Sequence, residues 1–449
     1  MNEFKDIRGR VIRPDDVDYD QARTIFYGGF DRRPAAIVRP ADVDDVARVV
    51  TLAASKGTEL AVRSGGHSLA GHSVSEGGIV LDLHDMRQLD IDVDGRTAWA
   101  QTGVTTGEYT TAAGAHGLAT GFGDTGSVGI GGITLAGGLG FLIRKHGLTI
   151  DNLLAAEVVT ADGRILHADE ETNPDLFWAI RGGGGNFGVV TRLEFRLHEV
   201  PEIVGGMLIF PASPEVVSGF LAEADAAPEE LSTIANVMVA PPMPFLPAAV
   251  HGRLVLMALV AFAGDVASGE KTVARLRDLG EPLVDMVKPM PYPELFFEPE
   301  GAEEFHPTAA SKTMFLDRFD EAAAKTVISH IENSSAMMSA TQLRVLGGAF
   351  ARVPADATAF AHRDRKIMAN IAAMYMDPSE HSTHAGWADN LASAIQEGSD
   401  DAYVGFIADQ SEEAPRRAYP EPTWSRLRQV KGRYDPTNLF RLNQNIPPA

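Results

Sequence analysis

Glycine-rich stretches in the first half of the chain constrain its possible folds more than any other feature of the sequence. Nine of the twenty residues at 121–140 are glycine, and residues 182–185 are four glycines in succession. Glycine weakens the interior of a helix or strand by about 0.5–1 kcal/mol per residue, so these stretches predict loops. Backbone N–H groups of such loops can surround an anionic ligand. We therefore expect a ligand site built largely from main chain.

Charge and composition agree with a main-chain site in a globular protein. The chain has 449 residues, which is too long for one ordinary core and predicts two domains. Its net charge of -22 disfavours nucleic acid and anionic membranes as partners and leaves an anionic cofactor to be bound by N–H groups. The absence of cysteine excludes disulfides and thiolate metal sites. His72, His116, His146 and His167 lack the spacing of metal ligands, so no metal is expected.

The first twenty residues do not have the pattern expected of a secretory signal. Residues 1–20 are charged from Glu3 onward and lack the apolar segment of a secretory signal. No stretch reaches the roughly 20 apolar residues that a membrane span requires. Cytoplasmic residence without a membrane partner is the resulting expectation.

The pattern of apolar residues predicts an α+β fold of two domains. In residues 1–204, short strands alternate with helices, among them one that opens near Pro40 and ends at Gly57. Residues 205–410 have longer amphipathic helices between apolar strands and form the expected second domain. Residues 411–449 are a C-terminal segment with a further helix. Other expected helices lie at 106–116, 139–146, 174–180, 216–226 and 266–279, and expected strands at 156–160 and 187–197.

The sequence RSGGHS at 63–68 follows a predicted strand and is a candidate phosphate-binding loop. Successive N–H groups in such a segment can form a concave anion site. An ordinary turn with a half-exposed histidine explains the same residues about equally well when they are taken alone. The spacing of the glycines matches neither the Rossmann fingerprint nor the P-loop, so neither a nicotinamide dinucleotide nor ATP is indicated.

Four further segments, taken with this loop, resemble one family. They are VGIGG at 128–132 with GGLG at 137–140, RKHGLTIDN at 144–152, LFWAIRGGGGNFGVV at 176–190, and YDPTNLFRLNQNIP at 434–447. Together they are similar to the berberine-bridge-enzyme-like oxidases, within the vanillyl alcohol oxidase and p-cresol methylhydroxylase superfamily. The middle of the chain is similar in a general way to the bacterial branch that includes 6-hydroxynicotine oxidase. The resemblance implies an FAD-binding domain of the p-cresol methylhydroxylase type and a substrate domain with a helix-covered antiparallel sheet.

The resemblance implies that FAD is the cofactor and that His67 is its covalent attachment point. A neutral imidazole is a competent nucleophile toward the electron-poor flavin. Many relatives add a second bond from a cysteine at the position of Thr125, so a single link is expected here. The other residues that the resemblance places at the cofactor are Arg63, Ser64, Gly65, Gly66, Ser68, Gly71, Gly126, Val128, Gly129, Gly131, Gly132, Gly138, Gly188, Val190, Asn443 and Gln444.

The resemblance also implies candidate catalytic residues. Val128 falls where a small residue leaves room for oxygen beside the flavin, although simple packing under a loop explains a valine there nearly as well. Tyr403 occupies the place of the family's catalytic tyrosine in a short Tyr-X-Asn-aromatic strand, but Gly405 replaces the asparagine and a buried tyrosine is more often a packing residue. Asn370 is a second candidate. His362 and Arg363 resemble a positioning pair.

The preferred interpretation is an FAD-linked oxidase that removes a hydride from a small organic alcohol or amine. Molecular oxygen would then reoxidise the flavin and give hydrogen peroxide. One alternative is a flavin dehydrogenase with another electron acceptor, and another is a flavin-binding protein without turnover. The oligomeric state and the substrate stay open.

Overall fold

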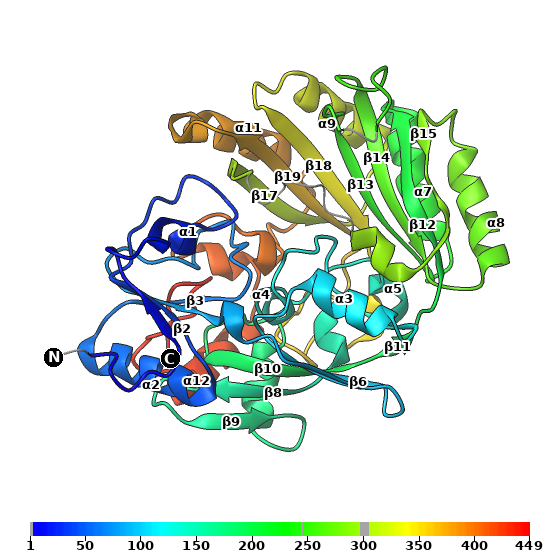
Figure 1. Cartoon of the computed structure of the whole chain (residues 1–449). Helices are drawn as coiled ribbons and strands as arrows, with labels where there is room; N and C mark the ends of the chain where they lie inside the picture. Colours follow the sequence, from blue (N-terminus) through cyan, green and yellow to red (C-terminus); the bar gives the residue numbers. More distant parts are fainter. Residues whose placement is uncertain (1–2, 244–245, 297–304) are drawn as a thin grey trace.

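Two layers of secondary structure face each other in this protein (Figure 1). The computed structural model describes residues 3–243, 246–296 and 305–449. Residues before β12 and the C-terminal segment form one layer, and a large sheet with its helices forms the other. The predicted α+β fold is confirmed. No helix within the described ranges is long and apolar enough to cross a lipid bilayer.

The first layer contains two sheets that support the glycine-rich loops. One has the order β1-β2-β4-β3, with β2 and β3 parallel to β4, and the other has the order β5-β6-β10-β8-β9 and is antiparallel. The strands are β1 Arg10–Ile12, β2 Ala36–Arg39, β3 Leu60–Arg63, β4 Ile79–Asp82, β5 Leu89–Asp92, β6 Thr97–Gln101, β8 Leu153–Val159, β9 Ile165–Ala168 and β10 Val189–Arg196. A short pair, β7 Leu118–Ala119 and β11 His198–Glu199, lies beside them.

Helix α2 (Val43–Lys56) shows how local sequence sets these elements. The Asp42 side chain accepts a hydrogen bond from the backbone N–H of Asp45, and Gly57 ends the helix with a φ of 65°, a left-handed conformation that suits glycine. The predicted helix is thus confirmed. The other helices of this half are α1 Tyr19–Arg23, α3 Thr106–Gly114, α4 Ile130–Ala136, α5 Ile143–His146 and α6 Pro174–Ile180.

The helix predicted for residues 139–146 is shorter than expected and begins only at Ile143. Gly137 and Gly138 have φ values of 126° and 78°, which lie outside the helical region. Gly140 packs so tightly that an added Cβ would lie 1.2 Å from the carbonyl oxygen of Phe122. This backbone contact, which periodicity does not encode, keeps the segment irregular.

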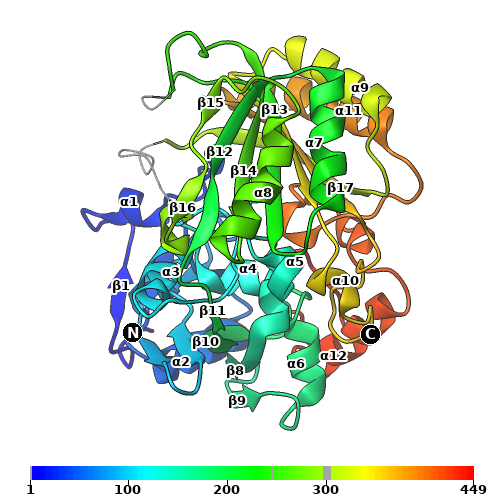
Figure 2. The same ribbon diagram turned by 90° about the vertical axis from the view of Figure 1, so that its right-hand side faces the viewer.

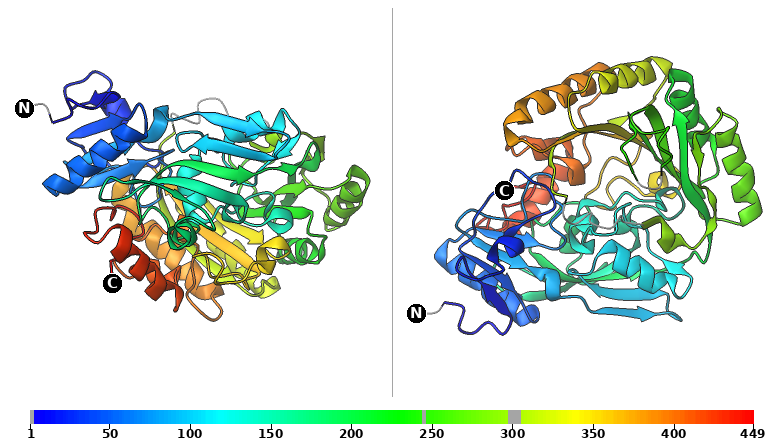
Figure 3. Two further views of the ribbon diagram at one scale, coloured as in Figure 1. Left: turned by 90° about the horizontal axis from the view of Figure 1, so that it is seen from below. Right: turned by 45° about the horizontal axis from the view of Figure 1, so that its top comes forward.

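The second layer is an antiparallel sheet with the order β15-β12-β14-β13-β18-β19-β17, and β16 also pairs with β12. Helices α7 to α9 and α11 cover its outer face (Figures 2 and 3). The strands are β12 Ile203–Pro211, β13 Leu231–Val239, β14 Leu254–Phe262, β15 Val284–Asp285, β16 Lys288–Met290, β17 Thr308–Leu316, β18 Met338–Val345 and β19 Ile367–Tyr375. The helices of this layer are α7 Pro214–Ala226, α8 Val266–Arg277, α9 Glu321–Glu332 and α11 His381–Ile395, and the short α10 Ala349–Arg352 lies against α5 of the first layer.

Alternation along the strands determines which side chains face the first layer. In β19, Ala369 and Ile371 belong to the core beneath the helices, whereas Met368 packs with residues of the first layer such as Leu139. Because side chains alternate between the two faces of a strand, Asn370 and Met374 lie on the same side as Met368. The inner face of the sheet therefore presents these side chains toward the glycine-rich loops.

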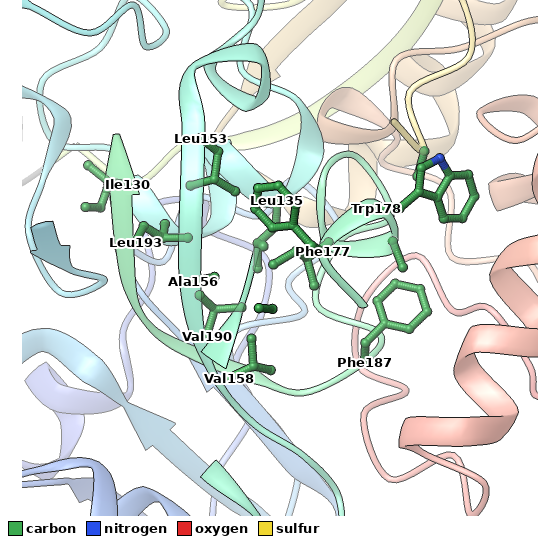
Figure 4. Close-up of a cluster of buried hydrophobic side chains, with 14 of the residues drawn as sticks. Ile130, Leu135, Leu153, Ala156, Val158, Phe177, Trp178, Phe187, Val190 and Leu193 are labelled. Atoms are coloured by element: carbon green, nitrogen blue, oxygen red, sulfur yellow. The ribbon is translucent and has the colours of Figure 1, made fainter. Parts of the chain in front are cut away.

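The C-terminal segment returns to the first layer. Helix α12 (Thr423–Tyr434) buries Leu427 and Val430 in the same core as α6 and β10, and Figure 4 shows residues of that core. Ala402 and Val404 also belong to it. The division of the chain at residues 204 and 410 stays a prediction.

Candidate functional site

A cavity of about 480 Å³ lies between the two layers. The three glycine-rich loops, the inner face of the large sheet and the C-terminal tail all contribute to its lining. The predicted residues that line it are Ser64, Gly65, Gly66, His67, Ser68, Thr125, Val128, Gly129, Gly131, Gly132, Gly188, Val190, Tyr403, Asn443 and Gln444. Residues distant in sequence are therefore brought to one site.

Four predicted cofactor residues support the cavity from behind and do not line it. The buried guanidinium of Arg63 donates to the carbonyl oxygens of Ala22 and Ser73 at 2.5 and 3.1 Å, which holds the 63–68 loop against α1. Gly71 packs against a ring, because an added Cβ would lie 2.5 Å from Phe30. The other two supporting residues are Gly126 and Gly138.

The 63–68 and 123–132 loops touch each other through their main chains. A Cβ on Gly65 would lie 2.2 Å from the backbone nitrogen of Gly129, and a Cβ on Gly129 would lie 2.1 Å from Ser64 Oγ. At Gly132, in contrast, an added Cβ would meet only open space. Gly132 lies in α4, a short helix inside the stretch that was predicted to be a loop. The loops and the start of α4 thus form a cradle whose wall at Gly132 has no side chain, which leaves room for a ligand against the backbone.

His67 is held at this cradle by an aromatic neighbour. Its ring stacks on Phe26, with centroids 4.2 Å apart and planes at 23°. The Phe26 backbone N–H donates to the carbonyl oxygen of Gly66 at 3.2 Å, so the two segments are joined by main chain as well. The imidazole is consequently fixed at the cavity wall.

Within the described lining, the only residues with formal charges at neutral pH are Asp124 and Arg344. They form an ion pair at 2.7 Å between Arg344 Nη2 and Asp124 Oδ2. Arg344 also donates to the carbonyl oxygen of Leu139 at 2.7 Å and to Gln342 Oε1 at 2.8 Å. This lining offers a pyrophosphate no unengaged Lys or Arg, so backbone N–H groups are the donors that would fit it.

His72 is a second histidine in the lining, and it is neutral at pH 7. Burial, and then the nearby positive charge of Arg32, lower the pKa of His72 to about 4. Its contribution to the site is that of an uncharged ring.

The C-terminal tail is fixed to the cavity by a buried polar network. Lys431 Nζ donates to Asp435 at 2.7 Å and to the carbonyl oxygen of Asn186 at 2.8 Å, and both Lys431 and Asp435 side chains are 0% exposed. Asn186 Oδ1 accepts from the Ile446 N–H at 2.9 Å. Asn443 Oδ1, on this tail, is buried without a hydrogen-bond partner in the described structure. A buried acceptor of this kind suits an N–H of a bound ring system such as a flavin.

Val128 lines the cavity as predicted. Its carbonyl oxygen accepts from the Thr106 N–H at 2.8 Å, and the next residue, Gly129, pairs with Thr105 in an isolated bridge. Its position is therefore fixed by α3, while its role toward oxygen stays a prediction.

Tyr403 lies in the lining, but the strand expected around it is a 3-10 helix, Val404–Phe406. The Phe406 N–H donates to the Tyr403 carbonyl oxygen at 3.0 Å and closes the turn. The buried Tyr403 hydroxyl accepts from the Gly138 N–H at 3.1 Å. Burial raises the pKa of Tyr403 to about 12, although the Gly138 N–H opposes the shift. The tyrosine thus belongs to the returning segment and lies outside the large sheet.

Asn370 lies on the inner face of β19 but outside the cavity lining. Its Oδ1 accepts from Ser311 Oγ at 2.8 Å, and it stands opposite Gln342 in the strand register. Met374, four residues further along the same face, does line the cavity. Asn370 is therefore adjacent to the site through its strand.

The lining also contains residues that the sequence did not predict, among them Tyr27, Asp124, Arg344, Met374 and Phe406. Asp124 and Phe406 stand beside predicted residues in the sequence, so proximity was an available signal. Nothing local marks Arg344, whose ion-pair partner is 220 residues away.

Two family models match the chain. The one described as an FAD-binding domain matches residues 34–169, and the one described as berberine and berberine-like matches residues 402–447. The chain is 32% identical to (R)-6-hydroxynicotine oxidase of Paenarthrobacter nicotinovorans, over 98% of this chain and 97% of that enzyme.

Solved structures of other oxidases have a similar fold. The structure of 6-hydroxy-D-nicotine oxidase from Arthrobacter nicotinovorans matches with a TM-score of 0.86 at 28% identity, over 99% of this chain and 98% of that one. Glucooligosaccharide oxidase from Acremonium strictum, described with a 6-S-cysteinyl, 8α-N1-histidyl FAD, matches with a TM-score of 0.85 at 23% identity, over 98% of this chain and 97% of that one.

Proposed function

Because this chain belongs to the berberine-bridge-enzyme-like family of FAD-linked oxidoreductases, we propose that it oxidises a small organic alcohol or amine with FAD bound covalently through His67. The observation that carries the proposal is the position of His67, which lines the cavity in a cradle formed by glycine-rich loops. FAD, when bound, supplies the hydride acceptor and passes electrons to oxygen, which becomes hydrogen peroxide.

The covalent link is supported by the surroundings of the imidazole. The stack with Phe26 limits rotation of the His67 ring, and a fixed nucleophile loses little entropy when it reacts. The glucooligosaccharide oxidase carries a histidyl and a cysteinyl bond to its flavin. This chain has no cysteine, and Thr125 lines the cavity at the position where the resemblance places the second bond. A single link is therefore the proposal.

The remaining cofactor contacts follow from the same geometry. The N–H groups of the 63–68 and 123–132 loops would hold the pyrophosphate, since Arg344 is already engaged by Asp124, Leu139 and Gln342. Asn443 Oδ1 would accept from the flavin ring. Lys431 and Asn186 act indirectly, because they hold the tail that carries Asn443.

Tyr403 is proposed as the proton acceptor, and Asn370 is the second candidate catalytic residue. A phenol with a pKa near 12 is almost wholly protonated at neutral pH, which makes it a weak base. The Gly138 N–H points at its oxygen and would stabilise the phenolate that forms as the substrate loses its proton. Asn370 lacks a titratable group and would orient the substrate.

Val128 is proposed to leave space for oxygen beside the flavin. The alternative dehydrogenase function differs only in the electron acceptor, so the rate of flavin reoxidation by oxygen distinguishes it from an oxidase. A flavin-binding protein without turnover would show no flavin reduction with any substrate.

The test is a substrate screen under nitrogen, read from bleaching of the flavin absorbance, with (R)-6-hydroxynicotine and glucooligosaccharides among the compounds. Bleaching by at least one alcohol or amine, followed by rapid return of the colour and peroxide when air is admitted, is the expected result. Bleaching without reoxidation in air would favour the dehydrogenase, and no bleaching across the screen would favour the protein without turnover.

A further inference from the structure

Tyr27 lines the cavity at the junction of the two layers. Its neighbour Phe26 stacks on His67 and meets the Tyr27 ring edge-on at 5.0 Å. The chain is pinned on the other side as well, because the Gly28 N–H donates to the carbonyl oxygen of Pro307 at 3.0 Å. The backbone on either side of Tyr27 is therefore held by both layers, close to the proposed flavin attachment point.

The Tyr27 hydroxyl differs from other tyrosine hydroxyls of this layer. Tyr403 is engaged by the Gly138 N–H, and the hydroxyl of Tyr109 lies 3.0 Å from Thr120 Oγ1 in the core. Tyr27 is only half-buried, and none of the described residues forms a hydrogen bond with its hydroxyl. A polar group that lines a cavity without a partner is available to a ligand.

The hydroxyl is a donor at neutral pH. Burial, and then the negative charge of Asp124, raise the pKa of Tyr27 to about 12. The phenol thus keeps its proton and can donate it in a hydrogen bond to an oxygen or nitrogen of a bound molecule.

The side chains that line the cavity favour an uncharged substrate, whereas the pyrophosphate of FAD would be held by backbone N–H groups of the glycine-rich loops. The two formally charged side chains of the described lining, Asp124 and Arg344, neutralise each other at 2.7 Å. Met374 and Phe406 add apolar surface on the substrate side. A charged substrate would lose its hydration here without gaining a free counter-ion, which is unfavourable.

We infer that Tyr27 determines specificity by donating its hydroxyl hydrogen to an oxygen or nitrogen acceptor of an uncharged, largely apolar substrate. The inference rests on the proposed function in assuming that the substrate enters this cavity. The contact lies on the side of the cavity formed by the first layer. A cavity of this kind favours small ring compounds over polyhydroxylated or ionic ones.

The experiment measures binding of pyridine, benzene and benzoate to the flavin-loaded protein at neutral pH, by perturbation of the flavin absorbance and by calorimetry. Pyridine and benzene have the same shape, and only pyridine has an acceptor nitrogen. We expect the affinity for pyridine relative to benzene to be about threefold to tenfold higher in wild-type protein than in Tyr27→Phe, the range of one hydrogen bond. Tyr109→Phe, which removes a hydroxyl from the core, should keep the wild-type preference.

Two outcomes would contradict the inference, and a third would contradict only the proposed function. An undiminished preference for pyridine in Tyr27→Phe, with normal flavin content and melting temperature, would refute the role of Tyr27. Tighter binding of benzoate than of pyridine would refute the uncharged substrate. The titration requires no turnover, so a protein that binds pyridine through Tyr27 but reduces its flavin with no substrate would defeat only the proposed function.

Discussion

Replacement of Lys431 by methionine should destabilise the protein strongly and loosen the flavin site. The ammonium group uses all three of its donors, on Asp435 Oδ2 at 2.7 Å, the Asn186 carbonyl at 2.8 Å and the Phe440 carbonyl at 3.0 Å. Methionine has a similar length and keeps the apolar packing. It leaves the fully buried Asp435 carboxylate without its counter-ion and two carbonyls without donors.

The expected loss is about 3–5 kcal/mol, the usual cost of breaking a buried ion pair from one side. That is a large part of the roughly 5–15 kcal/mol that stabilises a typical protein. Asp435 also accepts from the N–H groups of Leu439 and Phe440 at 2.8 and 2.9 Å, so the tail before Asn443 should lose order. Lower flavin content should accompany the lower stability.

The assay is urea denaturation followed by circular dichroism, together with the ratio of flavin to protein absorbance. Arg433→Met on the same helix is the matched control. Arg433 is 65% exposed and pairs with Asp175 at 2.7 Å, so its loss should cost about 0–1 kcal/mol. If Lys431→Met falls within this range and keeps full flavin content, the argument from burial is refuted.

Three further predictions concern the cavity. Val128→Leu should slow reoxidation by oxygen far more than reduction by substrate in stopped-flow traces, and equal oxidative rates would refute the oxygen assignment. Tyr403→Phe should lower the anaerobic flavin-reduction rate by about 10²-fold, the range of a positioned proton acceptor, and should flatten the rise of that rate with pH. If the rate is the same as in wild-type protein at every pH, Tyr403 only lines the pocket and takes no proton. The pKa of His72 is about 4 in the folded protein, against an ordinary 6.5 in the unfolded chain. Between these pH values the unfolded chain binds a proton that the folded protein does not, so the melting temperature should fall as the pH drops from 6.5 to 4. His72→Gln should show a shallower fall, and an identical pH profile would contradict the burial of a neutral ring.

Local signals predicted much of the first layer. The cap at Asp42 and the left-handed Gly57 lie within one turn of the helix that they bound, so they could be read from adjacent residues. The loop containing His67 follows β3 and lines the cavity, as its glycines and the preceding strand predicted. Such features depend on backbone preferences over a few residues.

Contacts between distant segments could not be predicted in this way. The Gly138 N–H and the Tyr403 hydroxyl are 265 residues apart, and their hydrogen bond accompanies the irregular backbone at 137–140, which includes the first residues of the helix expected at 139–146. Arg344 on β18 of the large sheet pairs with Asp124 in the glycine-rich segment, and these residues are 220 positions apart in the sequence. No sequence pattern marks Tyr27, because a tyrosine before two glycines is not distinctive of a binding site.

The covalent attachment of FAD through His67 is the central claim, and denaturation of the purified protein tests it most directly. Wild-type protein should keep its yellow colour in the pellet after acid precipitation and should show flavin fluorescence at its own position on a denaturing gel. His67→Ala should release all of its flavin as free FAD, because the chain has no cysteine to form another bond. Wild-type protein that loses all of its colour to the acid supernatant would contradict the claim.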